Sequence, residues 1–223
     1  RIIDGVCFIG TSEGSASPYD SCVVGDKIYV VSNHRVSIFS ADDLSYLGYF
    51  GSYGTGDGQL DQPRSICSDG TYLYVADFNN SRIQKFTLVG EYVSQIGNNG
   101  SGSGEFNKPF HICYYNGLLY IADIYNNRIQ VHSASNLGYV DNIPVSAWAM
   151  SSSVDEQNNC LVVDSYNHIN VFNLSTKNLE RLLSPIPISY GSILSGEYLY
   201  ISALFENKIY RFRYSDFSSA GEY

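Results

Sequence analysis

The sequence has little positive charge. Lys and Arg number 13 against 22 Asp and Glu, and the formal net charge is -9. Proteins bind nucleic acids largely by displacing counterions from phosphates with Lys and Arg, so this balance argues against a nucleic-acid partner. An anionic membrane surface is disfavoured for the same reason.

The sequence also has no long apolar run. No stretch approaches the roughly 18 apolar residues that a membrane-spanning helix needs. No charged segment followed by an apolar one marks a signal peptide. We therefore expect a soluble protein with no membrane partner, and its compartment stays open. The first residue, Arg1, is not a translation start, so we expect the chain to be processed or to belong to a larger one.

Patterns typical of metal sites and disulfide frameworks are missing as well. The five cysteines are odd in number and include no Cys-x-x-Cys pair. Three of them, Cys22, Cys67 and Cys113, each follow a proline by four residues. We interpret this recurrent position as a packing site for a small apolar side chain. Since no metal-binding motif is present, we expect no cofactor.

Aromatic residues, by contrast, are abundant. The chain contains 20 Tyr and 11 Phe, and 44% of its residues are hydrophobic while only 16% are charged. This composition is typical of a packed globular body. Aromatic and β-branched side chains suit the pleated, half-buried surfaces of sheets, so it also favours β-structure.

An internal repeat occupies nearly the whole chain. Each unit contains an alternating apolar run, a short polar turn and a second alternating run, which is the pattern of a β-hairpin. The units recur every 39 to 46 residues when aligned on Tyr29, Tyr74, Tyr120, Leu161 and Tyr200. A period of this length with several short strands per unit is typical of β-propeller blades.

Two further apolar runs flank each hairpin. The upstream run often opens with proline (Pro18, Pro63, Pro109 and Pro187), which is tolerated at the first residue of a strand. The four runs predict four antiparallel strands per unit. We therefore predict an all-β fold, a five-bladed β-propeller forming a single domain over residues 1–223. The predicted blades span residues 18–50, 63–97, 109–143, 145–183 and 187–223.

The N-terminal segment resembles a fourth strand that lacks its own blade. Residues 2–10 end in an apolar–Gly pair, as the fourth runs of the blades do. We expect this strand to pair with the last blade and close the ring, because closure removes exposed sheet edges. The alternative is a six-bladed ring in a longer chain.

Two segments carry a family resemblance. The sequences VADFNNSRIQKF (residues 75–86) and IADIYNNRIQVH (121–132) resemble NHL repeats, in which a strand ends in Asp before an Asn-containing turn and Arg-Ile-Gln. The resemblance implies a propeller that serves as a binding platform, often for protein and sometimes for RNA. It also admits an enzyme, since peptidylglycine-amidating lyases resemble this fold and hold a central zinc with histidines from several blades.

Acidic and basic residues recur at the predicted hairpins, in the pairs Asp77/Arg82, Asp123/Arg128 and Asp164/His168. A catalytic pair is needed only once, whereas these recur blade after blade. We therefore interpret them as structural turn pairs in which Asp accepts hydrogen bonds from turn N–H groups. The nearby glycine-rich stretches, residues 51–59 and 97–106, lack the strand–loop–helix order of a phosphate cradle and are predicted to be inter-blade turns.

A catalytic metal would need three or four ligands that converge on the propeller axis. The residues expected to line that axis are Asp20, Ser65, His111, Ala147 and Ser189, if Val145 opens the fourth blade. His111 and Asp20 alone are too few, so we expect no metal and no enzymatic activity. A metal-dependent lyase or hydrolase that uses the central channel is the alternative.

The predicted second-to-third-strand turns carry exposed aromatic residues. These are Phe78, Tyr125, Tyr166 and Phe205, and beside them at the strand openings lie Tyr19, Arg64, Phe110 and His111. Such rings pack between blades or anchor an interface, where aromatic residues and Arg concentrate binding energy. We therefore expect this face to bind a protein or peptide partner. A further alternative is a structural part of a larger assembly, such as a virion or a tail.

Overall fold

The structure is a computed structural model that describes residues 18–184, 189–195, 197–203 and 208–222. Over these residues it contains five four-stranded antiparallel sheets, each built from consecutive strands. The first two blades contain β1 (Pro18–Val24), β2 (Lys27–Ser32), β3 (Arg35–Ser40), β4 (Tyr46–Phe50), β5 (Ser65–Ser68), β6 (Tyr72–Asp77), β7 (Arg82–Thr87) and β8 (Tyr92–Ile96). The other three contain β9 (Pro109–Tyr115), β10 (Leu118–Asp123), η1 (Ile124–Asn126), β11 (Arg128–Ser133), β12 (Tyr139–Pro144), β13 (Ala149–Asp155), β14 (Cys160–Ser165), β15 (His168–Asn173), β16 (Leu179–Leu183), β17 (Ser189–Ser195), β18 (Tyr198–Ala203), β19 (Lys208–Arg213) and β20 (Ser219–Glu222).

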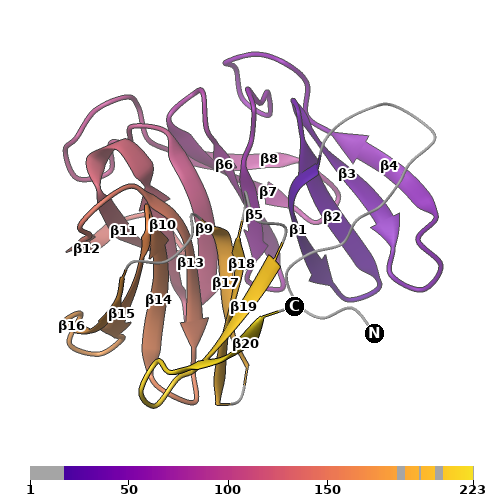
Figure 1. Cartoon of the computed structure of the whole chain (residues 1–223). Helices are drawn as coiled ribbons and strands as arrows, with labels where there is room; N and C mark the ends of the chain where they lie inside the picture. The colour runs from indigo at the N-terminus through magenta and orange to yellow at the C-terminus, as the bar shows by residue number, and fades with distance from the viewer. Residues whose placement is uncertain (1–17, 185–188, 196, 204–207, 223) are drawn as a thin grey trace.

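The five sheets are arranged around a common centre, as Figure 1 shows. The first strands of successive blades, β1, β5, β9, β13 and β17, lie side by side along the inside of the arrangement. The predicted all-β propeller of five four-stranded blades is confirmed. Among the described residues, no helix is long and apolar enough to cross a membrane.

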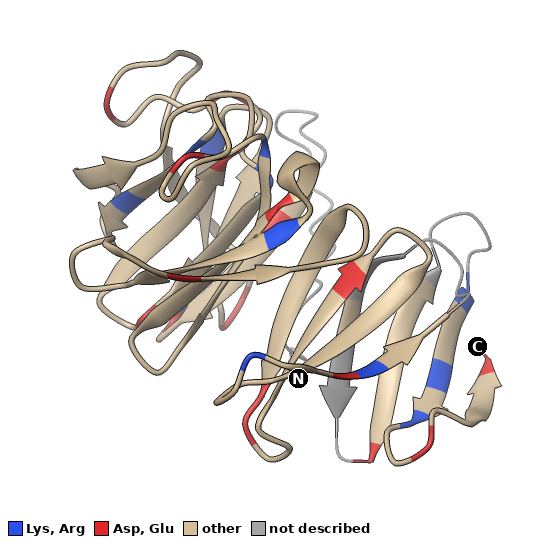
Figure 2. Ribbon diagram, turned by 90° about the vertical axis from the view of Figure 1, so that its left-hand side faces the viewer, with Lys and Arg blue, Asp and Glu red and all other residues tan. Residues whose placement is uncertain are grey.

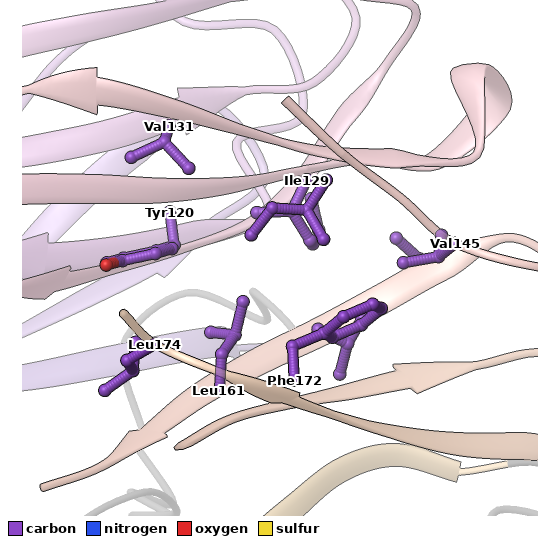
Figure 3. Packing of buried hydrophobic residues seen from close by; sticks show 11 residues of the cluster. Tyr120, Ile129, Val131, Val145, Leu161, Phe172 and Leu174 are labelled. Atoms are coloured by element: carbon purple, nitrogen blue, oxygen red, sulfur yellow. The ribbon is translucent and has the colours of Figure 1, made fainter. Parts of the chain in front are cut away.

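The hydrophobic core lies between the blades. Consecutive residues of a strand point to opposite faces, so each of blades 2, 3 and 4 packs one face against the preceding blade and the other against the next. Between blades 3 and 4, Tyr120 and Ile129 meet Leu161 and Phe172, all at most 4% exposed (Figure 3). Burial of apolar surface at these junctions is what holds the ring together.

The fourth blade is offset from the alignment that the sequence suggested. The sequence alignment matched Leu161 to Tyr29, Tyr74, Tyr120 and Tyr200. Each of these tyrosines is the third residue of the second strand of its blade, and the third residue of β14 is Val162. Val162 packs toward blade 5, whereas Leu161 packs toward blade 3. The blade opens at Ala149 and not at Val145. The offset arose because the apolar run of β14 contains no aromatic residue that marks the register.

The fourth strand of the last blade is formed by residues near the C-terminus, whereas we expected residues 2–10 to pair there. β20 pairs with β19 through Tyr210↔Glu222, Arg211↔Gly221 and Phe212↔Ser219. The position in this blade that we assigned to residues 2–10 is therefore occupied by residues 219–222. The predicted closing strand itself lies outside the described residues.

Candidate functional site

The candidate site is the face of the propeller that carries the turns between the second and third strands and the segments leading into the first strands. We call it the binding face. Phe78, Tyr125 and Tyr166 lie in these turns, and Arg64 directly precedes β5. Tyr19, Phe110 and His111 lie at the beginning of the first strands β1 and β9. Phe205, which the sequence also predicted there, lies outside the described residues.

Arg64 occupies an aromatic cage on this face. Its guanidinium carbon is 4.1 Å from the ring centroid of Tyr19, 5.2 Å from that of Phe78 and 5.8 Å from that of Phe110. Cations are attracted to the faces of aromatic rings at such distances. The three rings come from three blades, so the cage forms only when blades 1, 2 and 3 are assembled.

The hydrogen-bonding capacity of Arg64 is almost unused. Within the described residues, its side chain donates one hydrogen bond, from Nη2 to Oε1 of Gln62 at 3.3 Å. Its Nε is buried and has no acceptor there. A guanidinium carries five N–H donors, so a carboxylate brought to this cage could accept several of them.

Lys108 reinforces the positive charge beside the cage. Its Nζ lies 5.3 Å from the ring centroid of Phe78 and donates to Oδ1 of Asn79 at 3.0 Å. Two cations therefore lie within 5.3 Å of the Phe78 ring centroid. The sequence analysis did not single out Lys108, because its distance from the cage depends on how blades 2 and 3 pack.

Three half-exposed rings form a second cluster on the binding face. The ring centroids of Tyr125 and Trp148 are 5.8 Å apart, and those of Trp148 and Tyr166 are also 5.8 Å apart, both in edge-to-face geometry. The exposed fractions of Tyr125, Trp148 and Tyr166 are 48%, 48% and 42%. Trp148 was missed in the sequence because the offset of the fourth blade assigned it to the interior of a strand. We call these three residues the aromatic row.

His111 and Asp20 link neighbouring blades along the inner strands. The Asp20 carboxylate accepts from Ile66 N at 3.1 Å and from Ser65 Oγ at 2.6 Å. Ser65 Oγ in turn accepts from Ile112 N at 3.2 Å.

An equivalent hydrogen bond joins the next two inner strands, where His111 Nδ1 accepts from Ser152 N at 3.3 Å. In each case a side chain on one inner strand receives the backbone N–H of the next. The register of β13 also places Ser151, not Ala147, at the fourth inner position.

These contacts require His111 to be neutral, because its Nδ1 must present a lone pair. Burial lowers the pKa of His111, and the nearby Asp20 carboxylate opposes that shift. Burial raises the pKa of the inner-strand thiols Cys22 and Cys113 to about 12 and about 11. Among the described residues, no three His, Cys, Asp or Glu side chains are grouped so that they could hold a metal ion.

The pair Asp77/Arg82 holds an inter-blade loop. Arg82 Nε donates to Asp77 Oδ2 at 2.7 Å, and the two side chains are 6% and 0% exposed. The other guanidinium nitrogens donate to the carbonyls of Thr55, Gly56 and Gln59 and to Gln95 Oε1. Asp77 Oδ1 accepts from Asp61 N at 2.7 Å. The pair thus clamps the glycine-rich loop that precedes β5.

Blade 3 repeats the clamp. Arg128 Nε donates to Asp123 Oδ2 at 2.8 Å, and the guanidinium also bonds the carbonyls of Ser101, Gly102 and Glu105. Asn126 and Gln130 donate to carbonyls of this loop, and Asn80 and Gln84 donate in the same way to the loop that Arg82 holds. Within the described residues Arg82 makes five hydrogen bonds and Arg128 makes four, so both guanidinium groups are engaged mainly in holding the loops.

The expected pair Asp164/His168 requires correction. In the β14–β15 ladder Asp164 lies opposite Ile169, whereas Ser165 lies opposite His168. Asp164 and His168 therefore leave opposite faces of the sheet. Asp164 Oδ2 accepts from Ser151 Oγ at 2.7 Å, and His168 Nδ1 contacts the Tyr166 carbonyl.

Charged residues are scattered over the blades. In the view of Figure 2, Lys and Arg are mixed with Asp and Glu over most of the blades, and the basic residues Lys208, Arg211 and Arg213 follow one another along the single strand β19. A protein that tracks a phosphate backbone carries a basic stripe along one face or along an element.

Comparisons with solved structures show the fold. Hydrazine synthase of Kuenenia stuttgartiensis superposes with a TM-score of 0.70 at 14% identity, over 93% of this chain and 66% of the other. The WD40 β-propeller domain of Doa1 gives a TM-score of 0.73 at 14% identity, over 94% and 69%. The chain therefore spans 66% and 69% of these two structures.

No curated protein matches the sequence. A family model described as a 6-bladed beta-propeller (DUF5128) matches residues 21–223. This match covers almost the whole chain, and its propeller architecture agrees with the sheets described above. The chain belongs to this family of 6-bladed β-propellers.

Proposed function

We propose that this chain is a non-enzymatic binding module that holds a protein or peptide partner on the binding face. The observation that carries the proposal is the aromatic row, Tyr125, Trp148 and Tyr166, with three rings about half exposed on one side of the ring. Blades 2 and 3 resemble NHL repeats, and that resemblance also favours a binding platform.

The aromatic row has the chemistry of an interface anchor. Trp and Tyr supply large contact areas at low cost in side-chain entropy, and they are enriched among residues that dominate binding energy. The edge-to-face contacts hold the three rings in one arrangement before a partner arrives. Less ordering is then required on binding, which favours affinity.

The Arg64 cage adds a polar determinant to the same face. Arg64 and Lys108 provide positive charge in a chain whose formal net charge is -9. A carboxylate of the partner would accept from the guanidinium in a charge-assisted, bidentate geometry. We therefore propose a partner segment that carries apolar side chains together with an acidic one.

The test is selection from a random peptide display library on the immobilised protein. A variant with Tyr125, Trp148 and Tyr166 changed to Ala should lose at least about tenfold in affinity for the selected peptides, because it removes the anchor rings. A matched control changes Tyr46 and Tyr139 to Ala. These rim-strand residues are similarly exposed, at 49% and 43%, and the control should bind as the parent does.

The cage is tested separately with Arg64→Lys. Lysine keeps the charge but cannot form the bidentate contact, so peptides with acidic residues should bind more weakly while their amidated counterparts are unaffected. Equal loss of binding in the rim control, or selection of no peptide that depends on the aromatic row, would contradict the proposed function. Tight, salt-sensitive RNA binding by the parent protein would do the same.

A further inference from the structure

One position on the binding face recurs at the entry to blades 2, 3 and 4, and it is occupied by Gln62, Lys108 and Trp148. We call these the entry residues. Each lies three residues before an inner-strand residue that pairs with the penultimate residue of the second strand, in the pairs Ser65↔Ala76, His111↔Ala122 and Ser151↔Asp164. The place in the fold is therefore the same, while the side chain changes from an amide to a cation to an indole.

Each entry residue meets the hairpin turn of the preceding blade. In blade 2 its backbone N–H donates to His34 Nδ1 at 3.4 Å. In blade 3 its ammonium lies 5.3 Å from the ring centroid of Phe78. In blade 4 the ring centroids of the indole and of Tyr125 are 5.8 Å apart. The entry residue therefore sets the chemistry that each junction between blades presents on the binding face.

The Arg64 cage and the aromatic row are joined through the segment beside Lys108. Tyr125 N donates to Asn107 O at 3.3 Å, so the first ring of the row is bonded to the backbone next to Lys108. Phe110, two residues after Lys108, lies edge-to-face against Phe78, with ring centroids 5.9 Å apart. The cage and the row are therefore parts of one surface that continues over blades 2, 3 and 4.

The two ends of this surface differ in charge. Arg64 and Lys108 supply two cations at one end, and within the described residues neither forms a salt bridge. At the other end Trp148 occupies the place of the cation. Among the described residues, no Lys or Arg lies over a ring of the aromatic row. A complementary ligand has a carboxylate at one end and apolar side chains at the other.

We propose, building on the function proposed above, that the cage and the aromatic row hold one linear segment of the partner in a single direction. An acidic residue of the segment binds at Arg64 and Lys108, and an aromatic or aliphatic residue binds at Trp148. The entry residues determine which side chain each junction accepts. The direction is fixed because the reversed segment would place its carboxylate against rings without a cation and leave both cations unpaired.

The test compares peptides selected from a random display library by the parent protein and by the variant Trp148→Lys. The parent should enrich peptides that carry an acidic and an apolar residue in one order and at a constant spacing. Trp148→Lys gives blade 4 the entry residue of blade 3. Its peptides should therefore carry an acidic residue at the position where the parent selects an apolar one.

A synthetic peptide from the parent selection separates the two junctions. Lys108→Gln gives blade 3 the entry residue of blade 2, and it should weaken binding at least about fivefold. A copy of the peptide with its acidic residue changed to the amide should respond little to Lys108→Gln. Trp148→Ala should weaken both peptides by the same factor, since it acts at the other junction.

Lys27→Gln is the matched control for the loss of one positive charge. Lys27 begins β2, at the end of the strand opposite the binding face, and its substitution should leave the affinity for both peptides unchanged. The melting temperatures of all variants are compared with that of the parent, so that a loss of binding is not mistaken for a loss of folding.

The failure of this proposal differs from the failure of the proposed function. Peptides that depend on the aromatic row but carry an acidic residue at no constant position would overturn the fixed direction and leave the binding module intact. Selection of the same peptides by the parent and by Trp148→Lys would do so too. If no selected peptide depends on the aromatic row, the proposed function fails and the direction of binding fails with it.

Discussion

Blades 2 and 3 differ from blade 4 in how they join their neighbours. In blades 2 and 3 a four-residue turn separates Asp77 from Arg82 and Asp123 from Arg128, and each pair clamps a glycine-rich loop. In blade 4 a two-residue turn joins β14 to β15, and the side chains at its base, Ser165 and Asn170, bond each other at 2.6 Å.

This contrast explains the role of the recurrent Asp–Arg pairs. The Asp–Arg ion pair occurs in the blades that hold a long glycine-rich loop. Blade 4 has no such pair among its described residues, and it follows a short connection over residues 145–148. A buried ion pair is stable only when its remaining donors and acceptors are satisfied, and here the loop carbonyls satisfy them. The motif is therefore tied to loop anchoring and not to chemistry at the face.

The largest effect is expected from Asp77→Ala. It leaves Arg82 buried without its carboxylate and removes the acceptor of Asp61 N, which should cost about 3–5 kcal/mol of unfolding free energy. Urea titration measures the change. The matched substitution Asp216→Ala alters an exposed turn carboxylate in blade 5 and should cost much less. Equal losses in the two variants would show that the clamp adds no stability.

A smaller effect is expected from Gly97→Ala. Gly97 begins the loop that Arg128 clamps, has φ of +106°, and an added Cβ would lie 2.6 Å from Phe106 Cδ2 and 2.8 Å from Ser81 O. Strain and overpacking together should cost about 3 kcal/mol. Gly25→Ala, at φ of +59° with open space around it, should cost about 1 kcal/mol in the same titration. If the two glycines respond alike, the loop is not packed against the blade as described.

A third effect concerns acid pH and the inner strands. The pKa of His111 is lowered in the folded protein by burial, so folding favours the neutral imidazole. The stability that this shift provides is present above the unfolded pKa of about 6.5 and is lost as pH falls below it. The unfolding free energy should therefore fall between about pH 7 and pH 5, less steeply in His111→Gln. Glutamine retains an acceptor for Ser152 N but does not titrate. An unchanged pH slope in that variant would contradict the assignment.

The smallest effect is expected from Glu222→Gln. The pair formed by Lys208 and Glu222 in blade 5 is 3.0 Å apart, but the side chains are 43% and 57% exposed. Exposed pairs contribute about 0–1 kcal/mol, so the change in unfolding free energy should lie below about 0.5 kcal/mol and vanish at high salt. A loss comparable to that of Asp77→Ala would mean that burial is not what distinguishes the clamps.

Several features of the candidate site could be predicted from the sequence, and others could not. The repeat placed Phe78, Tyr125 and Tyr166 in equivalent turns, because turn position follows from the hairpin pattern alone. It failed for Trp148 and for the pair Asp164/His168, because the register of a strand is set by its partners and a slip of one residue exchanges its faces. The cage around Arg64 was missed as a unit, since its rings come from three blades.

The repeat, the four-stranded blades and the Asp–Arg pairs of blades 2 and 3 could be predicted from the sequence alone. These depend on residues close together in the chain, whose periodicity and spacing are visible locally. The contacts between blades became visible in the three-dimensional structure: the cage of Arg64, the row through Trp148 and the loop carbonyls that accept from Arg82. Such contacts join residues dozens of positions apart, and their geometry is fixed by how apolar faces pack between sheets.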